Sequence, residues 1–159
     1  MNRILALDPG TEKSGWATVC RKTGRIHDSG TELNLEALAR IARHRGPVAI
    51  EQMQEQGRGV LGKTTVWAML WSGRFWEVAD RQGNIVIWIP RSTAKSQAGA
   101  HPSDDDAGLA RALRRNHGDC GERDCGAGCQ SKACPLRRTD THRRAAMAVG
   151  IAAHRKLKP

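Results

Sequence analysis

The chain has 159 residues, 39% of them hydrophobic, which is enough apolar material for one buried core and a single domain over residues 1–159. Its 26 lysines and arginines exceed its 16 acidic residues, and the net charge of +10 favours a polyanionic partner, nucleic acid above all. An anionic membrane surface is the competing partner, but no basic amphipathic helix, lipidation signal or membrane-length apolar run is evident.

The apolar residues near the N-terminus are interrupted by Asp8 and Pro9, so we expect no signal peptide. Five cysteines without a secretory signal indicate a reducing, cytoplasmic location, where clustered thiols bind metal more often than they form disulfides.

Apolar periodicity predicts the elements of the first third of the chain. They are strands at 4–7, 15–20 and 25–29, a helix at 35–42 and a strand at 48–50. The three opening strands follow one another closely, with turn residues at 22–24, so they predict an antiparallel meander.

The pattern of the remaining chain is that of an α/β protein. A helix starts at Thr64 or Thr65, a strand at 85–89 ends before Pro90, and two further helices are expected at 104–115 and 141–156. A cysteine-rich insertion at 118–136 precedes the last helix, and no internal repeat is present.

Two carboxylates directly follow buried strands. Asp8 ends the first apolar run and Glu51 ends the run at 48–50, so each acid is expected at the carboxyl end of a strand. If the two strands are neighbours, the carboxylates converge and can bind Mg²⁺ or Mn²⁺, which prefer oxygen ligands. For either acid alone, a simpler interpretation is available: Asp8 begins an Asp-Pro-Gly turn and Glu51 solvates a strand end.

The segments around these acids, ILALDPGTEKSGWA and VAIEQM, resemble the first and second catalytic segments of RuvC-type resolvases of the ribonuclease H-like superfamily. LWSGRFWE, which contains Gly73, and IPRSTAKS resemble a helix and a strand-to-loop segment of phage-type members. The resemblance spans nearly the whole chain. It implies a mixed five-stranded sheet with helices on both faces, and a homodimeric, Mg²⁺-dependent endonuclease that cuts branched DNA such as Holliday junctions in recombination and repair.

The resemblance also implies an acid on the last helix, but Ala145 occupies the usual position. We carry the ligand role to Asp140, so that Asp8, Glu51 and Asp140 would hold two cations for phosphodiester hydrolysis, with His142 as a further ligand or proton carrier. A helix N-cap is the alternative role for Asp140.

Lys95 is a candidate contact for the scissile phosphate, or an ordinary solvated lysine in a loop. The residues predicted to contact DNA are basic and flank the predicted site: Arg58, Lys63, Arg91, Arg137, Arg138 and Arg143. Solvated helix faces are the alternative for several of them.

Four cysteines of the insertion are spaced C-x4-C-x3-C-x4-C and are interleaved with glycines: Cys120, Cys125, Cys129 and Cys134. Four thiolates suit a structural Zn²⁺, which would order a segment that has too few apolar residues for its own core. Disulfides, an iron-sulfur cluster and free thiols remain alternatives, and the resemblance does not predict this insertion. Cys20 is expected to be a small core residue.

Two further patterns have structural interpretations. The acids at 104–106 precede a helix and are expected to cap it and to offset its dipole. Trp67, Trp71 and Trp76 have near-helical spacing and are expected in the core or a dimer interface rather than as base-stacking surfaces.

Other functions are compatible with parts of this pattern. A ribonuclease H-like nuclease could instead cut RNA in a hybrid or single-strand flaps. Because Ala145 replaces an acid, a non-catalytic junction-binding protein is a second alternative. A sugar-kinase-like ATP site is disfavoured, since the chain is too short for two lobes.

Overall fold

The computed structural model describes residues 2–53, 62–117, 136 and 139–158. At its centre lies a five-stranded sheet of β1 (Arg3–Asp8), β2 (Lys13–Cys20), β3 (Ile26–Leu33), β4 (Val48–Gln52) and β5 (Val86–Pro90). The strand order is β3-β2-β1-β4-β5. The pairs β3-β2 and β2-β1 are antiparallel, whereas β1-β4 and β4-β5 are parallel, so the sheet is mixed.

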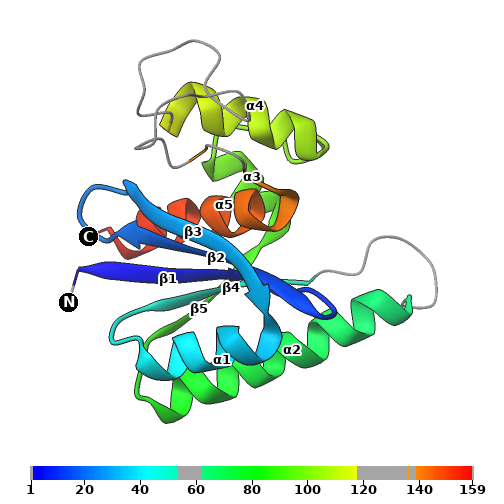
Figure 1. Cartoon of the computed structure of the whole chain (residues 1–159). Coiled ribbons are helices and arrows are strands. Elements are labelled where there is room, and N and C mark those ends of the chain that lie inside the picture. Colours follow the sequence, from blue (N-terminus) through cyan, green and yellow to red (C-terminus); the bar gives the residue numbers. More distant parts are fainter. Residues whose placement is uncertain (1, 54–61, 118–135, 137–138, 159) are drawn as a thin grey trace.

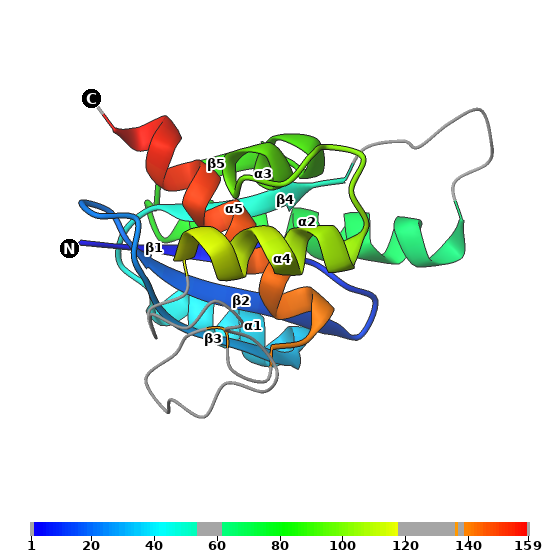
Figure 2. The same cartoon turned by 90° about the horizontal axis from the view of Figure 1, so that it is seen from above.

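Helices cover both faces of the sheet (Figure 1). The helices α1 (Asn34–Arg43) and α2 (Lys63–Arg81) lie on one face. The helix α5 (Thr141–Leu157) crosses the other face, and α3 (Arg91–Gln97) and α4 (Asp106–His117) lie beyond it. In Figure 2, where the molecule is seen from above, α4 and α5 lie in front of the strands. The predicted α/β class, the meander and the mixed five-stranded sheet with helices on both faces are therefore confirmed.

The central strand is apolar on both sides because both of its faces are covered. Residues 4–7 of β1 are buried, and alternate side chains enter two separate cores. Ile4 and Ala6 pack with α5, while Leu5 and Leu7 pack with Phe75 of α2. The continuous apolar run that predicted a buried strand follows from this position.

Small residues let α5 approach the sheet closely. Residues 145–153 of this helix are all buried, and Gly150 faces β1 and β2. A Cβ at Gly150 would lie 2.5 Å from Val19 Cγ2, closer than carbon atoms can approach. The small-apolar run is therefore the contact surface that places the start of α5 at the sheet edge.

One element was not predicted. The segment 91–97, expected as a loop, forms α3 directly after β5, with Pro90 as its N-cap residue and Ala94 buried. Lys95 therefore lies on a helix, and its interpretation as a loop residue was wrong. A helix of seven residues is too short to be recognised from apolar periodicity in the sequence. Its one buried residue, Ala94, packs in the core only once the chain has folded.

Candidate active site

The two predicted carboxylates lie side by side at one edge of the sheet. Asp8 is the last residue of β1, and Glu51 lies near the end of β4. These strands are parallel neighbours whose register pairs Leu7 with Ile50, so Asp8 and Glu51 are the next residues along. Both are buried, with 5% and 2% of their surface exposed. The adjacency on which the predicted metal site depends is therefore present.

Glu51 is a buried carboxylate with one oxygen unpaired. Its Oε1 accepts a hydrogen bond from Arg91 Nη1 at 3.0 Å, while Oε2 is buried without a partner among the described residues. Burial and then the negative charge of Asp8 raise the pKa of Glu51 to about 7, although Arg91 opposes the change. Its unpaired Oε2 can therefore bind a metal cation, and a bound cation would stabilise the charged form of the carboxylate.

His142, in the first turn of α5, lies beside Asp8. Its Nδ1 is 2.7 Å from Asp8 Oδ2, and this hydrogen bond raises the pKa of the imidazole. A glycine at position 15 makes the approach possible, because a Cβ there would lie 2.1 Å from the His142 backbone oxygen. Gly10 also lies near the imidazole, but an added Cβ there would first meet the Lys13 backbone oxygen, at 2.1 Å. Gly15 therefore admits His142 to the site, a role that was not recognised in the sequence.

Asp140 occupies a different place. It is the N-cap residue of α5, where Oδ1 accepts a hydrogen bond from the Arg143 backbone N–H at 2.8 Å and Oδ2 accepts one from Thr31 Oγ1 at 2.7 Å. Its carboxylate does not line the cavity that contains Asp8. Ala145, at the position of the usual acid, is buried against the sheet. The capping geometry is thus present, and the ligand role of Asp140 stays a prediction.

Arg91 links Glu51 to an acid that the sequence did not assign to the site. Its Nη2 donates to Asp106 Oδ1 at 3.1 Å, so its guanidinium bridges two carboxylates. Asp105 does cap its helix, accepting from the Gly108 N–H at 2.8 Å, as expected for this run of acids. No spacing rule connects residue 106 to residue 51, because only the folded chain brings the start of α4 to Arg91 at the start of α3.

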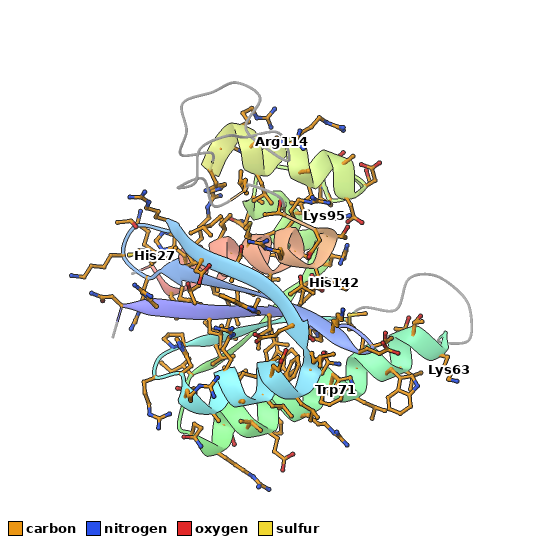
Figure 3. All side chains as sticks on the ribbon, in the orientation of Figure 1. His27, Lys63, Trp71, Lys95, Arg114 and His142 are labelled. Carbon is orange, nitrogen blue, oxygen red and sulfur yellow. The ribbon has the colours of Figure 1, made fainter. Side chains whose placement is uncertain are left out.

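The other predicted residues lie around or outside this centre. Lys95 Nζ donates to the backbone oxygen of Asp104 and does not line the cavity. Lys63 is exposed at the start of α2 (Figure 3). Arg143 donates to Ser29 Oγ at 3.1 Å. The remaining predicted DNA contacts and zinc ligands lie outside the described residues: Arg58, Arg137, Arg138, Cys120, Cys125, Cys129 and Cys134.

An open cavity of about 490 Å³ contains the site. Asp8, Glu51, Arg91 and His142 line it, together with residues 9–13, Thr31, Met53 and the start of α2. Both buried carboxylates are therefore accessible to a ligand from this side, where the strand ends meet solvent.

The residues of the site fit Mg²⁺ with few protein ligands. In the described part of the chain, no three His, Cys, Asp or Glu side chains form a ready-made metal cluster. However, Mg²⁺ often takes only one or two carboxylates and completes its shell with water and substrate phosphate oxygens. Asp8 and the unpaired Oε2 of Glu51 meet that requirement.

The strand order, with a three-stranded antiparallel meander followed by two parallel strands, defines a ribonuclease H-like α/β fold. Comparison with solved structures supports this class. The structure of Thermus thermophilus RuvC is similar over 97% of this chain and 95% of its own, with a TM-score of 0.64 and 15% identity. T. thermophilus RuvC in complex with Holliday junction substrate gives a TM-score of 0.67 at 15% identity, over 98% and 95% of the two chains.

Sequence comparisons give no further assignment. No protein-family model matches the chain, and no curated protein matches it. Among the helices that the structure describes, none combines the length and the apolar character needed to traverse a bilayer.

Proposed function

We propose that this protein is a metal-dependent, structure-selective endodeoxyribonuclease that hydrolyses phosphodiesters in branched DNA such as four-way junctions. The observation that carries the proposal is the pair of buried carboxylates, Asp8 and Glu51, on adjacent parallel strands at an open cavity. The ribonuclease H-like fold and the net charge of +10 support it.

Each cavity residue has a role in this proposal. Asp8 and Glu51 would hold Mg²⁺ or Mn²⁺, which would activate a water and stabilise the leaving oxygen. His142 is held by Asp8 through Nδ1, so its other ring nitrogen is available to ligate or to move a proton. Arg91 provides a cation beside Glu51 that can contact the scissile phosphate.

His142 and Asp140 are the two candidates for the third ligand. His142 lines the cavity, whereas both oxygens of Asp140 are engaged in the helix cap and with Thr31. The geometry therefore favours His142 as the third ligand. Asp140 keeps its predicted ligand role, which the substitution Asp140→Ser tests. Lys63, Arg91 and Arg143 stay proposed DNA contacts, and Lys95 would need to leave its hydrogen bond to Asp104 to reach a phosphate.

The direct test uses a labelled synthetic four-way junction, with and without Mg²⁺ or Mn²⁺, and the variants Asp8→Asn and Glu51→Gln. We expect paired nicks near the crossover that require metal and disappear in both variants. Tight binding without cleavage in either metal would contradict catalysis and leave a junction-binding protein. Preferential cleavage of an RNA/DNA hybrid or a flap would contradict the junction substrate and retain the nuclease.

We propose in addition that the protein works as a homodimer through the outer face of α2. Four residues on this face are large, apolar and 40–53% exposed: Val66, Met69, Leu70 and Trp76. Together with Gly73, where an added Cβ would meet nothing within 4 Å, they follow the alternating three- and four-residue spacing of helix-helix seams. A four-way junction needs two cuts, and a two-fold dimer supplies two sites.

Sedimentation tests the dimer. The wild-type chain should sediment as a dimer at micromolar concentration, and Leu70→Glu should sediment as a monomer with an unchanged circular dichroism spectrum. A Leu70→Glu variant that remains dimeric would place the interface elsewhere.

A further inference from the structure

A second hollow of about 690 Å³ opens beside the catalytic cavity, and we call it the Trp67 groove. It is lined by residues of the β1-β2 turn, α1 and the start of α2: Thr11, Glu12, Leu33, Asn34, Leu35, Lys63, Thr64, Trp67 and Trp71. Thr11, Glu12 and Thr64 line the catalytic cavity as well. The two hollows therefore share a wall, and a polymer strand in one can continue into the other.

Three of the groove's lining residues are large, apolar and exposed. Leu35 is 68% exposed, Leu33 50% and Trp67 48%. Neither core cluster includes Trp67, so of the two places expected for this tryptophan, the core or a dimer interface, the core is excluded. An indole left half exposed next to two exposed leucines is a surface that binding of an apolar or aromatic group would cover.

Trp67 differs in this respect from its helical neighbour Trp71. Trp71 packs against the core, lies 6.0 Å from the ring of Phe75 and has the Arg74 guanidinium 4.9 Å from its ring centroid. Among the described residues, Trp67 makes no ring or cation-π contact. Its ring face is thus open to an aromatic ligand, and Figure 3 shows Trp71 and Lys63 on the same helix.

The charged residues of the groove indicate which part of a nucleotide would enter. Glu12 lies in the shared wall, and its carboxylate would repel a phosphate there. The same carboxylate can accept a hydrogen bond from an exocyclic amino group of cytosine or adenine. Lys63, at the end of the groove where α2 begins, can pair with a backbone phosphate. A base therefore fits inside the groove and the backbone fits along its rim.

We propose that the Trp67 groove binds an unpaired nucleobase of the DNA strand whose backbone enters the catalytic cavity, with Trp67 as the stacking surface and Lys63 on the adjoining phosphate. This inference rests on the proposed function only in taking DNA as the polymer in the cavity. It extends that function by assigning a site for a base displaced from the duplex next to the cut.

The test compares wild type with Trp67→Phe, Trp67→Ala and a control, Ile85→Ala, which removes an equally exposed apolar side chain far along the chain. Binding is measured in EDTA, so that no cleavage occurs, on four-way junctions in which one base at a time is removed through the crossover strands. Because base-aromatic stacking contributes about 1–3 kcal/mol, Trp67→Ala should weaken binding to the intact junction about 5- to 150-fold.

The abasic series should show where that affinity originates. Wild type should lose a similar factor at one or two abasic positions, and Trp67→Ala should lose nothing further at those positions. Trp67→Phe should retain most of the affinity, and Ile85→Ala all of it.

Unchanged binding by Trp67→Ala, or equal sensitivity of wild type and Trp67→Ala to every abasic position, would overturn the proposal. A loss of affinity that accompanies dissociation to monomers in sedimentation would also overturn it and would make the groove an interface between copies.

Cleavage in Mg²⁺, measured in parallel, separates the two proposals. Normal cleavage with no dependence on Trp67 refutes the groove alone. Trp67-dependent base binding without any metal-dependent cleavage refutes the nuclease and leaves the groove.

Discussion

Replacing Glu51 with glutamine should stabilise the metal-free protein at alkaline pH. The pKa of Glu51 is about 7, against an ordinary value of 4.5, because the side chain is buried and faces Asp8. The unfolded chain therefore releases this proton at lower pH than the folded chain does. The wild-type protein loses stability as the pH rises from 4.5 to about 7 and keeps the full penalty above that range.

The size of the effect follows from the two pKa values. At about 1.4 kcal/mol for each pKa unit, the difference corresponds to roughly 3 kcal/mol in the free energy of unfolding. Glutamine retains the shape and a carbonyl oxygen for Arg91 but carries no proton to release. The stability of Glu51→Gln relative to wild type should thus rise by about 3 kcal/mol between about pH 4 and about pH 8.

Urea denaturation in EDTA, followed by circular dichroism, measures this difference across the pH range. Glu77→Gln is the matched control, because Glu77 is an exposed residue of α2 paired with Arg81. It should change stability by less than about 0.5 kcal/mol at every pH. A Glu51→Gln variant whose stability follows the wild-type pH profile would refute the buried, repelled carboxylate. Mg²⁺ should then raise the stability of wild type and not that of Glu51→Gln, since binding to the folded state alone stabilises it.

Substitutions at further positions test other parts of the fold. Gly15→Ala should destabilise the fold by several kcal/mol in urea denaturation, because its Cβ would lie 2.1 Å from the His142 backbone oxygen. Burial lowers the pKa of His44 below 6.5, so the unfolded state takes up that proton first and stability falls as the pH drops through 6.5. His44→Gln should reduce this fall in urea titrations at about pH 7.5 and about pH 5.5, and an unchanged slope would contradict it. Asp140→Ser should keep the helix cap, whereas Asp140→Ala should lower the free energy of unfolding by about 1 kcal/mol. If Asp140→Ser still cleaves junctions, Asp140 is not a metal ligand. If Asp140→Ser has normal stability but no cleavage, the ligand role is established.

Most of the element positions could be predicted from the sequence, because apolar periodicity depends on local spacing. The runs at 4–7 and 48–50 are apolar throughout since both faces of the central strands are covered, and the acids that follow them necessarily lie at strand ends. The carboxyl-terminal position of Asp8 and Glu51 was thus determined by the sequence. The small residues of 145–153 likewise determined that the last helix would be buried.

The composition of the cavity was decided by tertiary structure. Parallel pairing of β1 with β4 brings Asp8 next to Glu51, and Gly15 admits His142 to Asp8. The Arg91 bridge to Asp106 depends on how α4 packs, which no local pattern encodes. The position of Asp140 at a helix start suits both a cap and a ligand. The tertiary structure places its carboxylate in the cap and beside Thr31, and the ligand role stays a prediction. Sequence spacing fixes which face of an element a residue occupies, but contacts between distant elements are fixed by the packing that buries the most apolar surface.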